Sequence, residues 1–465
     1  MSDLLVRSGT VVTASGSRRA DVLVADGRIE AVLDPEAGAR AAESAGAIVD
    51  ADGLLVLPGV IDVHTHTRIA TDAHPDRFFQ DTVAAAFGGT TTLFAFNNPG
   101  TGASPAARRS LATGLAEWRK ATSSDAAVDI APSLAILGGM DDPVAELPAV
   151  VEAGVPTAKA FMVYDFALDD RRLFDALATM GKVGGLLEVH CEDPVLIDAG
   201  VAAARARGMT RPRDHAASRS PLAEAVATHR ALAFAAAADA PIHIVHLSSA
   251  AALDEVRRAR AAGVRVSVET CPQYLSLTAE RYEGTDADAI RYVISPPLRT
   301  AADRDALWAG LADGTLDIVA TDHVPDRLDL EKRVPAPPFP DISNGAPGVE
   351  TLLAVVYGEG VGRGRITVER MVDVLSTTPA RWFGLGSKGS IEPGLDADLV
   401  LFDPAARRTI RAADLHHTSD YTPYEGLSVA GAVRSVFVRG RAVVRDGIFV
   451  GERGLGRFVE RTIRA

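Results

Sequence analysis

The chain has 465 residues, of which 47% are hydrophobic and 23% charged, so most of it can bury enough apolar surface to fold. Its formal charge is −13, which argues against nucleic acid and anionic membrane surfaces as partners. These values exclude a mainly disordered protein.

Cysteine content and the N-terminal sequence indicate a cytoplasmic setting. Cys191 and Cys271 are the only cysteines, so neither a disulfide framework nor a C-x-x-C zinc pattern is present. The first residues lead directly into strand-like sequence without a basic leader, and no stretch reaches about 18 uninterrupted apolar residues. We therefore expect a cytoplasmic protein without a membrane-spanning segment.

Both ends of the chain consist of short strands and tight turns. Residues 1–58 alternate strand-like runs with turns such as Asp26-Gly27. Residues 386–465 repeat this texture, with a turn at Asp446-Gly447. Neither end makes a core alone, so we predict that the two ends pair into one small β-sandwich domain that flanks the middle of the chain.

Residues 59–385 alternate strand-length apolar runs with Ala-rich segments of helical period. One such segment is 222–238, in which one side carries Leu222, Ala225, Val226 and Leu232. Eight such alternations predict an α/β fold, a (β/α)8 TIM-like barrel, which places its chemistry at the carboxyl ends of its strands. A long proline-rich loop is predicted at 325–345. The eight runs are 60–66, 90–97, 128–136, 157–162, 185–190, 241–246, 264–269 and 316–322.

Chemically reactive side chains gather in or at the ends of these runs. Residues i and i+2 of a strand share a face, so His64 and His66 point two imidazoles at one place. This pair alone is also compatible with two hydrogen-bonded core histidines. A lysine, two further histidines and an aspartate at other strand ends favour a metal site. The full set is His64, His66, Lys159, His190, His246 and Asp322.

Lys159 is the unexpected member of this set. An ammonium group is repelled by divalent cations and has no lone pair to donate. Either the side chain points away, or it is chemically changed. Addition of carbon dioxide to the neutral amine would form a carbamate, whose two oxygens can bridge two metals and whose charge partly neutralises them.

Sequence motifs around these residues resemble the cyclic amide hydrolases of the amidohydrolase superfamily, and most closely the dihydropyrimidinase and hydantoinase family. The resemblance extends over essentially the whole chain. The motifs are PGVIDVHTH at 58–66, KAFMVY at 159–164, VHCE at 189–192, VHLS at 245–248, ETCPQYL at 269–275, SPPLR at 295–299, TDH at 321–323, PAR at 379–381, GLDADLV at 394–400 and TPYEG at 422–426.

The resemblance implies a site with two divalent metal ions, usually zinc, joined by a carbamate on Lys159 and a bridging hydroxide. It places His64, His66 and Asp322 on one metal, and His190 and His246 on the other. Asp322 then takes the proton of the attacking hydroxide and passes it to the leaving ring nitrogen. Tyr164 matches the family tyrosine that donates to the developing oxyanion, although a packing tyrosine at a strand end is the alternative.

The same resemblance points to the substrate-binding residues. Backbone groups at the positions of Ser295 and Asn344 hold the cyclic amide in the family. Arg68 departs from the hydantoinase pattern, and together with Asn98 it resembles the carboxylate-binding residues of dihydroorotases. Asp326 stands where a dihydroorotase carries a further histidine, and a solvated loop arginine is the alternative for Arg68.

These features predict a metal-dependent hydrolase that opens the ring amide of a dihydropyrimidine or 5-substituted hydantoin to an N-carbamoyl amino acid. The alternatives are an allantoinase or dihydroorotase type of cyclic amidase, or a catalytically silent, assembly-forming relative of dihydropyrimidinase. Loss of metal ligands marks the silent relatives, and this chain keeps all six. The family resemblance also implies a homotetramer.

Overall fold

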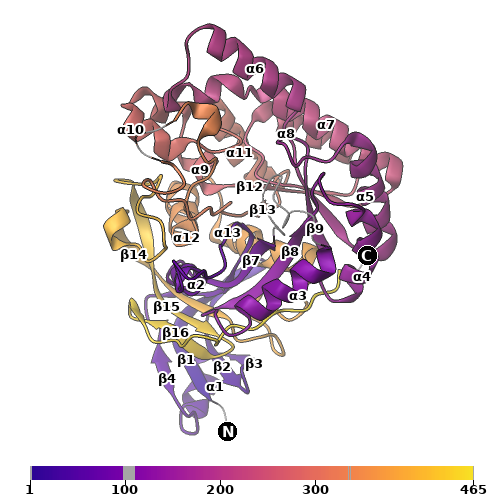
Figure 1. Ribbon diagram of the computed structural model, residues 1–465. Coiled ribbons are helices and arrows are strands. Elements are labelled where there is room, and N and C mark those ends of the chain that lie inside the picture. Colours follow the sequence, from indigo (N-terminus) through magenta and orange to yellow (C-terminus); the bar gives the residue numbers. More distant parts are fainter. Residues whose placement is uncertain (1–2, 98–109, 334, 336, 464–465) are drawn as a thin grey trace.

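Eight parallel strands form the central barrel of the computed structural model, which describes residues 3–97, 110–333, 335 and 337–463 (Figure 1). The strands follow one another in chain order around the barrel, and the backbone N–H of His66 closes the ring by donating to the carbonyl of His323 at 2.7 Å. The predicted barrel is confirmed. Its strands are β6 (Val60–Thr65), β7 (Thr90–Asn97), β8 (Asp129–Ala135), β9 (Thr157–Phe161), β10 (Leu186–His190), β11 (Ile242–Ile244), β12 (Val266–Thr270) and β13 (Ile318–Val319).

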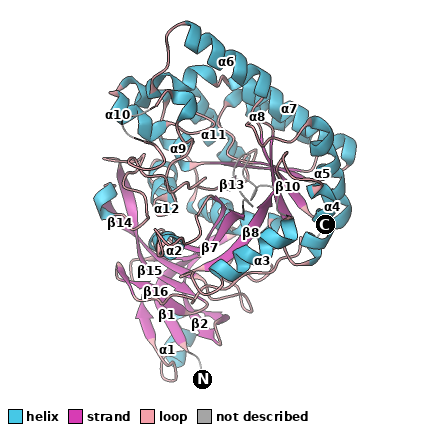
Figure 2. Ribbon diagram, viewed as in Figure 1, coloured by secondary structure: helices cyan, strands magenta, loops and turns pink. Residues whose placement is uncertain are grey.

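Helices cover the outside of the barrel (Figure 2). Several of them begin directly after the loops that leave the carboxyl ends of the strands, and a Ser, Thr or Asp side chain accepts a hydrogen bond from the first turn of each of these. These capped helix starts lie at one end of the barrel, where the chain turns back from strand to helix. The outer helices are α2 (Arg77–Phe87), α3 (Leu111–Thr122), α4 (Pro143–Glu152), α5 (Asp170–Val183), α6 (Pro194–Ala206), α7 (Pro221–Ala238), α8 (Ala250–Ala261) and α11 (Ala301–Asp313).

Helix α7 forms as predicted, but its buried face differs from the expected one. Ala225 and Leu232 of the expected face are buried, but Leu222 and Val226 are 60% and 38% exposed. The other buried positions are mostly alanine, together with Glu224. Small side chains let α7 pack closely on its neighbours α5 and α8. The apolar period therefore identified the helix correctly and its buried side only in part.

Strands from both chain ends form a second sheet of nine strands beside the barrel. The N-terminal strand β5 pairs with the C-terminal strand β14 from Leu399↔Pro58 to Phe402↔Leu55, so the two halves of the expected sandwich are one continuous mixed sheet. Residues from both ends share one apolar core. The strands are β1 (Leu4–Thr13), β2 (Gly16–Ala25), β3 (Arg28–Leu33), β4 (Ile48–Asp50), β5 (Leu55–Pro58), β14 (Leu399–Thr409), β15 (Ser428–Val438), β16 (Arg441–Arg445) and β17 (Ile448–Phe449).

The C-terminal tail leaves this sheet and returns to the barrel. In Figure 1 its yellow ribbon crosses beneath α3 and ends beside α4. The N–H of Gly456 donates to Ala126, and that of Val459 donates to Ile130 in β8. The tail therefore packs against the barrel wall. The division of the chain into domains at 58/59 and 385/386 stays a prediction.

Short helices make up the remaining elements. Within the described part of the chain, no helix is both long enough and apolar enough to cross a membrane. The short α-helices are α1 (Pro35–Ala41), α9 (Pro272–Ser276), α10 (Asp286–Ala289), α12 (Leu352–Val356), α13 (Val368–Val372) and α14 (Thr378–Trp382). The short 3-10 or π turns are η2 (Pro212–Ser218), η3 (Ala279–Glu283), η4 (Ile290–Tyr292), η5 (Phe339–Asp341), η6 (Tyr357–Val361), η7 (Asp373–Thr377) and η8 (Ala412–Asp414).

Candidate metal centre and active site

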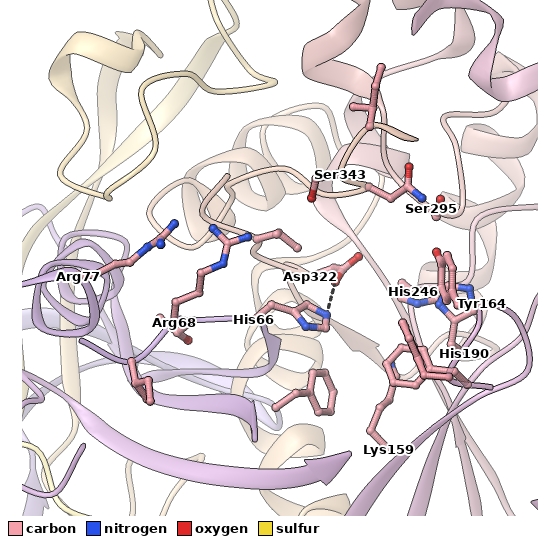
Figure 3. Close-up of a pocket in the computed structure, with 18 of the residues that line it drawn as sticks. His66, Arg68, Arg77, Lys159, Tyr164, His190, His246, Ser295, Asp322 and Ser343 are labelled. Atoms are coloured by element: carbon pink, nitrogen blue, oxygen red, sulfur yellow. Dashed lines mark ion pairs between the residues drawn. The ribbon is translucent and has the colours of Figure 1, made fainter. Parts of the chain in front are cut away.

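A cavity of about 650 Å³ lies at the carboxyl ends of the barrel strands (Figure 3). In the close-up, Lys159, His190, His246 and Tyr164 lie on one side, and Arg68 and Arg77 lie on the other. Its described lining is His66, Thr67, Arg68, Ile69, Thr71, Arg77, Phe96, Trp118, Lys159, Phe161, Tyr164, Phe166, His190, His246, Ser295, Asp322, Val324, Ile342, Ser343 and Asn344.

His64, His66 and Asp322 converge at the floor of the cavity. The Nε2 atoms of His64 and His66 lie 3.1 and 3.2 Å from Asp322 Oδ1. Both imidazoles therefore point at the region that Asp322 Oδ1 faces, as ligands of one cation would.

Glu269, at the end of β12, holds the opposite side of His64. Its Oε1 contacts His64 Nδ1 and accepts the backbone N–H of His246 at 3.0 Å, while its Oε2 lies 3.1 Å from His243 Nε2. Burial and Lys159 oppose protonation of His64, but the carboxylates of Glu269 and Asp322 raise its pKa to about 9. The two carboxylates thus create a place for positive charge, which a metal cation can occupy in place of the proton.

His190 and His246 stand on the other side of the centre, with ring centroids 4.5 Å apart. Burial lowers the pKa of each imidazole, so both favour the neutral form that binds metals. His190 Nε2 lies 2.9 Å from Glu192 Oε2, and Arg219 contacts the same carboxylate oxygen. This buried pair orients the His190 ring, as partners behind metal-bound histidines commonly do.

The Lys159 side chain is fully buried, and its Nζ has no hydrogen-bond partner in the described structure. It lies 4.7 Å from the centroid of the Phe96 ring. Burial lowers the pKa of the ammonium, which favours the neutral amine, and the carboxylates of Glu269 and Glu188 act in the opposite direction. A buried amine without an acceptor is costly, so this nitrogen fits a group that carries further ligand atoms.

The donor set fits a metal centre. Donor atoms of His64, His246 and Asp322 all lie within 4.8 Å of one another. Two ligands held about 2.1 Å from a tetrahedral zinc ion are about 3.4 Å apart, close to the His64 and His66 distances from Asp322. The buried, unpartnered Lys159 Nζ adds a second indication.

Three residues at the cavity have a backbone in the left-handed region, which is strained for side chains other than glycine. The φ angles are 81° for Tyr164, 39° for His246 and 50° for Asp322. Each follows the end of a barrel strand, where the chain turns outward. The fold therefore bears local strain at three of the positions that the sequence singles out.

Tyr164 stands beside the histidines, with its ring centroid 5.4 Å from that of His190. Burial raises the pKa of its phenol, and nearby Arg219 acts against this shift. The hydroxyl therefore stays protonated and able to donate. Its ring also lies 5.4 Å from the guanidinium carbon of Arg219.

Ser295 and Asn344 form the wall above the metal ligands. Buried side-chain oxygens of both residues, Ser295 Oγ and Asn344 Oδ1, have no hydrogen-bond partner among the described residues. Arg68 lies across the cavity and contacts Asp326 and Glu331, the latter at 2.8 Å. Asn98 lies outside the described residues, so the structure does not place it.

Sequence reasoning overlooked the groups behind the ligands. Glu269 and Glu192 are buried and contact the site histidines, and buried Arg219 contacts Glu192, yet the sequence motifs gave these three residues no role. A carboxylate at the end of a barrel strand is the signal that could have singled out Glu269. Arg219, on the loop before α7, carries no such positional signal.

Comparisons with known proteins agree with this site. A model described as "Amidohydrolase family" matches residues 215–443, and one described as "Dihydro-orotase-like" matches residues 53–252. A D-hydantoinase of Ralstonia pickettii is 39% identical over 99% of each chain. A D-hydantoinase of Streptomyces coelicolor is 38% identical over 99% of this chain and 98% of its own.

A solved dihydropyrimidinase from Brevibacillus agri is similar in three dimensions. It matches with a TM-score of 0.92 and 39% identity over 100% of both chains. Identity at this level along the full length confirms the resemblance seen in the motifs. The chain therefore belongs to the amidohydrolase family, as a cyclic amide hydrolase of the hydantoinase and dihydropyrimidinase type.

Proposed function

We propose that the protein opens the ring amide of a dihydropyrimidine or a 5-substituted hydantoin to an N-carbamoyl amino acid. The carrying observation is that Ser295 and Asn344, whose peptide groups have no hydrogen-bond partner among the described residues, line the same cavity as the metal ligands. A cyclic amide offers one N–H and one C=O side by side, and such a pair can bond to peptide groups of this kind.

Hydrogen bonding in residues 292–296 supports a role for Ser295. The carbonyls of Tyr292, Val293, Ile294 and Pro296 accept bonds from the side chains of Tyr282, Lys332, His215 and Tyr274 respectively. Among the described residues, neither the N–H nor the carbonyl of Ser295 takes part in a hydrogen bond. Buried peptide groups are rarely left unpaired, so a ligand is the natural partner here.

Residues 343–346 show the same arrangement around Asn344. The carbonyls of Ser343 and Gly345 accept from Lys332 and Tyr421, and the Gly345 N–H donates to Val293. The peptide N–H and carbonyl of Asn344 have no partner within the described chain. Two unpaired peptide groups thus border one cavity.

We assign two divalent metal ions, zinc by donor type, to the ligand set. His64, His66 and Asp322 would hold one ion, His190 and His246 the other, and a carbamate on Lys159 would join them. The bound ions would polarise the amide carbonyl and lower the pKa of water. The unpartnered Lys159 Nζ, whose pKa burial lowers, supports the carbamate.

Asp322 and Tyr164 would carry the proton transfers. His64 and His66 hold the pKa of Asp322 well below its usual range despite burial, so it remains a carboxylate that can accept a proton and deliver it to the leaving nitrogen. The protonated phenol of Tyr164 would donate to the carbonyl oxygen as negative charge develops.

The wall near Arg68 would contact the substituent on the ring. Its guanidinium contacts Asp326 and Glu331, but Glu331 also pairs with Arg77 and Asp326 lies 3.7 Å from Lys332, so three cations share two carboxylates there. Phe96 and Phe166 add apolar surface to the cavity. We propose that Arg68 contacts an acidic or strongly polar substituent on the ring, and the dihydroorotase type stays the alternative.

A turnover panel tests the function directly. Dihydrouracil, 5-phenylhydantoin, 5-isopropylhydantoin, allantoin and dihydroorotate would be incubated with the metal-loaded protein, and N-carbamoyl products would be measured by chromatography. Hydrolysis of dihydrouracil or a hydantoin is the expected result. Turnover confined to allantoin or dihydroorotate, or turnover of none, would contradict the proposal.

We further propose a cytoplasmic homotetramer. Two buried free thiols, Cys191 and Cys271, support a reducing compartment. Val195 at the start of α6 and Leu222 at the start of α7 are 72% and 60% exposed, and exposed apolar side chains favour subunit contacts. Light scattering after gel filtration would measure the mass of the assembly. A monomer mass at micromolar concentration would contradict the homotetramer.

A further inference from the structure

Lys332 is buried completely in the loop that follows the last barrel strand, with 0% of its side chain exposed. Its Nζ donates to the carbonyl of Val293 at 2.8 Å and to that of Ser343 at 2.6 Å. Asp326 Oδ2 lies 3.7 Å away. A charged side chain is buried this deeply only when its partners offset the loss of water.

These two carbonyls belong to the two segments that border the substrate cavity. Val293 lies two residues before Ser295, and Ser343 lies directly before Asn344. The segments meet at one further bond, from the Gly345 N–H to the Val293 carbonyl at 3.1 Å. Lys332 therefore links the two segments close to the unpaired peptide groups of Ser295 and Asn344.

The lysine is itself anchored on two sides. Asp326 contacts the guanidinium of Arg68, which follows strand β6, and the Asp326 carbonyl accepts from Ser419 in the C-terminal part of the chain. Glu331 pairs with both Arg68 and Arg77. The ammonium thus stands at the centre of contacts that reach the barrel and the C-terminal segment.

We propose that Lys332 is a positioning residue that fixes the spacing between the peptide groups of Ser295 and Asn344, and so sets the affinity for the cyclic amide. The proposal rests on the function inferred above, in which these groups bind the ring. Lys332 does not touch the reacting atoms. Its loss should loosen the two segments relative to each other and leave the metal ligands in place.

The variant Lys332→Met keeps the length of the side chain and removes its three donors. With a hydantoin or dihydrouracil as substrate, KM should rise about tenfold or more, because small displacements of binding groups are costly, while kcat changes less than about threefold. Metal content should match that of the wild type. Lys182→Met, the same change on the exposed surface of α5, should leave every value unchanged.

Hydrogen exchange provides a readout that needs no substrate. In Lys332→Met, peptides covering 290–297 and 343–348 should exchange faster than in the wild type, with peptides of β9 and β10 unchanged. An unaltered KM with unaltered exchange in both segments would overturn the proposal. Loss of metal together with a collapse of kcat would also overturn it, because Lys332 would then support the whole site.

The two proposals fail in different ways. If the wild type hydrolyses no cyclic amide, the proposed function fails, while the exchange data still decide whether Lys332 positions the segments. If Lys332→Met does not fold, Lys332→Gln keeps two N–H donors on a shorter chain. It should raise KM at least threefold and speed exchange in both segments, and unchanged values would overturn the proposal.

Discussion

Unpartnered polar atoms collect at a few residues of this cavity. Lys159 Nζ, Ser295 Oγ and Asn344 Oδ1 are all buried and lack hydrogen-bond partners within the described structure. Each such atom costs stability unless a ligand satisfies it. Their concentration around one space, together with strained backbone at Asp322, marks a site built for groups that bind to it.

The bridging role of Lys159 can be tested by metal content. Lys159→Ala removes the nitrogen on which a carbamate would form, so the protein should lose most of its metal and its activity. Added short carboxylic acids, which can take the place of the bridge, should restore part of both. Elemental analysis with an activity assay measures this, and full metal content in the variant would contradict a bridging lysine.

Asp322 is expected to move the proton. Asp322→Asn keeps the shape of the side chain but cannot accept a proton, so the rate should fall on the order of 10²-fold or more. Asp141→Asn, an exposed change, serves as the matched control. Near-normal turnover of Asp322→Asn at full metal content would assign the proton transfer to another group.

Tyr164 should act on the transition state. Tyr164→Phe removes one donor to the oxyanion and should cost about 2 to 4 kcal/mol of transition-state stabilisation, seen as a lower kcat. Tyr357→Phe, at a half-exposed position outside the cavity lining, is the control. A change confined to KM would make Tyr164 a binding residue.

At the level of elements, a buried ion network joins the barrel to the flanking sheet. Lys388 Nζ lies 2.8 Å from Asp129 in β8 and 2.5 Å from Asp398 beside β14. Arg439, at the end of β15, contacts Asp129 as well. The carboxylates raise the pKa of Lys388 although burial acts against them, so the group stays charged.

Breaking this network should destabilise the molecule without altering the site. Lys388→Met leaves Asp129 and Asp398 buried with one cation fewer, which typically costs about 3 to 5 kcal/mol. Urea unfolding should show an earlier midpoint, and kcat of the folded protein at 25 °C should be unchanged. A midpoint equal to that of the wild type would show that Arg439 alone balances both carboxylates.

At the level of the whole molecule, the barrel is open to substrate at one end and closed by the tail at the other. Arg461 is 2% exposed, and it donates to the carbonyl of Pro132 at 2.6 Å and to that of Phe383 at 3.2 Å. Its guanidinium carbon lies 4.5 Å from the Phe94 ring centroid. The last residues therefore complete the core beneath the site.

Buried neutral histidines should make stability depend on pH. Burial and His323 lower the pKa of His417 to about 4, whereas an unfolded histidine titrates near 6.5. Between these values only the unfolded chain binds the proton, so stability falls as pH falls through this window.

For His417 alone, the unfolding free energy at pH 5 is lower than at pH 7.5 by about 2 kcal/mol. His417→Gln should reduce the difference in unfolding free energy between pH 7.5 and 5.0 by about this amount, measured by urea titration. His229→Gln, at a side chain that is 71% exposed, should leave the difference as in the wild type. An unchanged difference in His417→Gln would show that this histidine is protonated in the folded state.

Sequence by itself determined the barrel, the pairing of the chain ends and the identities of the candidate ligands. These follow from local rules, because the alternation of strands and helices appears within short windows and the carboxyl ends of parallel strands meet at one edge. His64 and His66 share a face through the period of one strand. The family motifs are equally local.

Only the tertiary structure decided which groups stand behind that site. Glu269 contacts His64 across 205 residues, and Lys332 joins carbonyls 39 and 11 residues away. Arg68, interpreted from sequence as a carboxylate-binding or a solvated loop residue, contacts Asp326, 258 residues further along the chain. The packing of distant segments decides which residues become such partners, because a buried charge is stable only beside an opposite charge. A local sequence pattern does not contain this information.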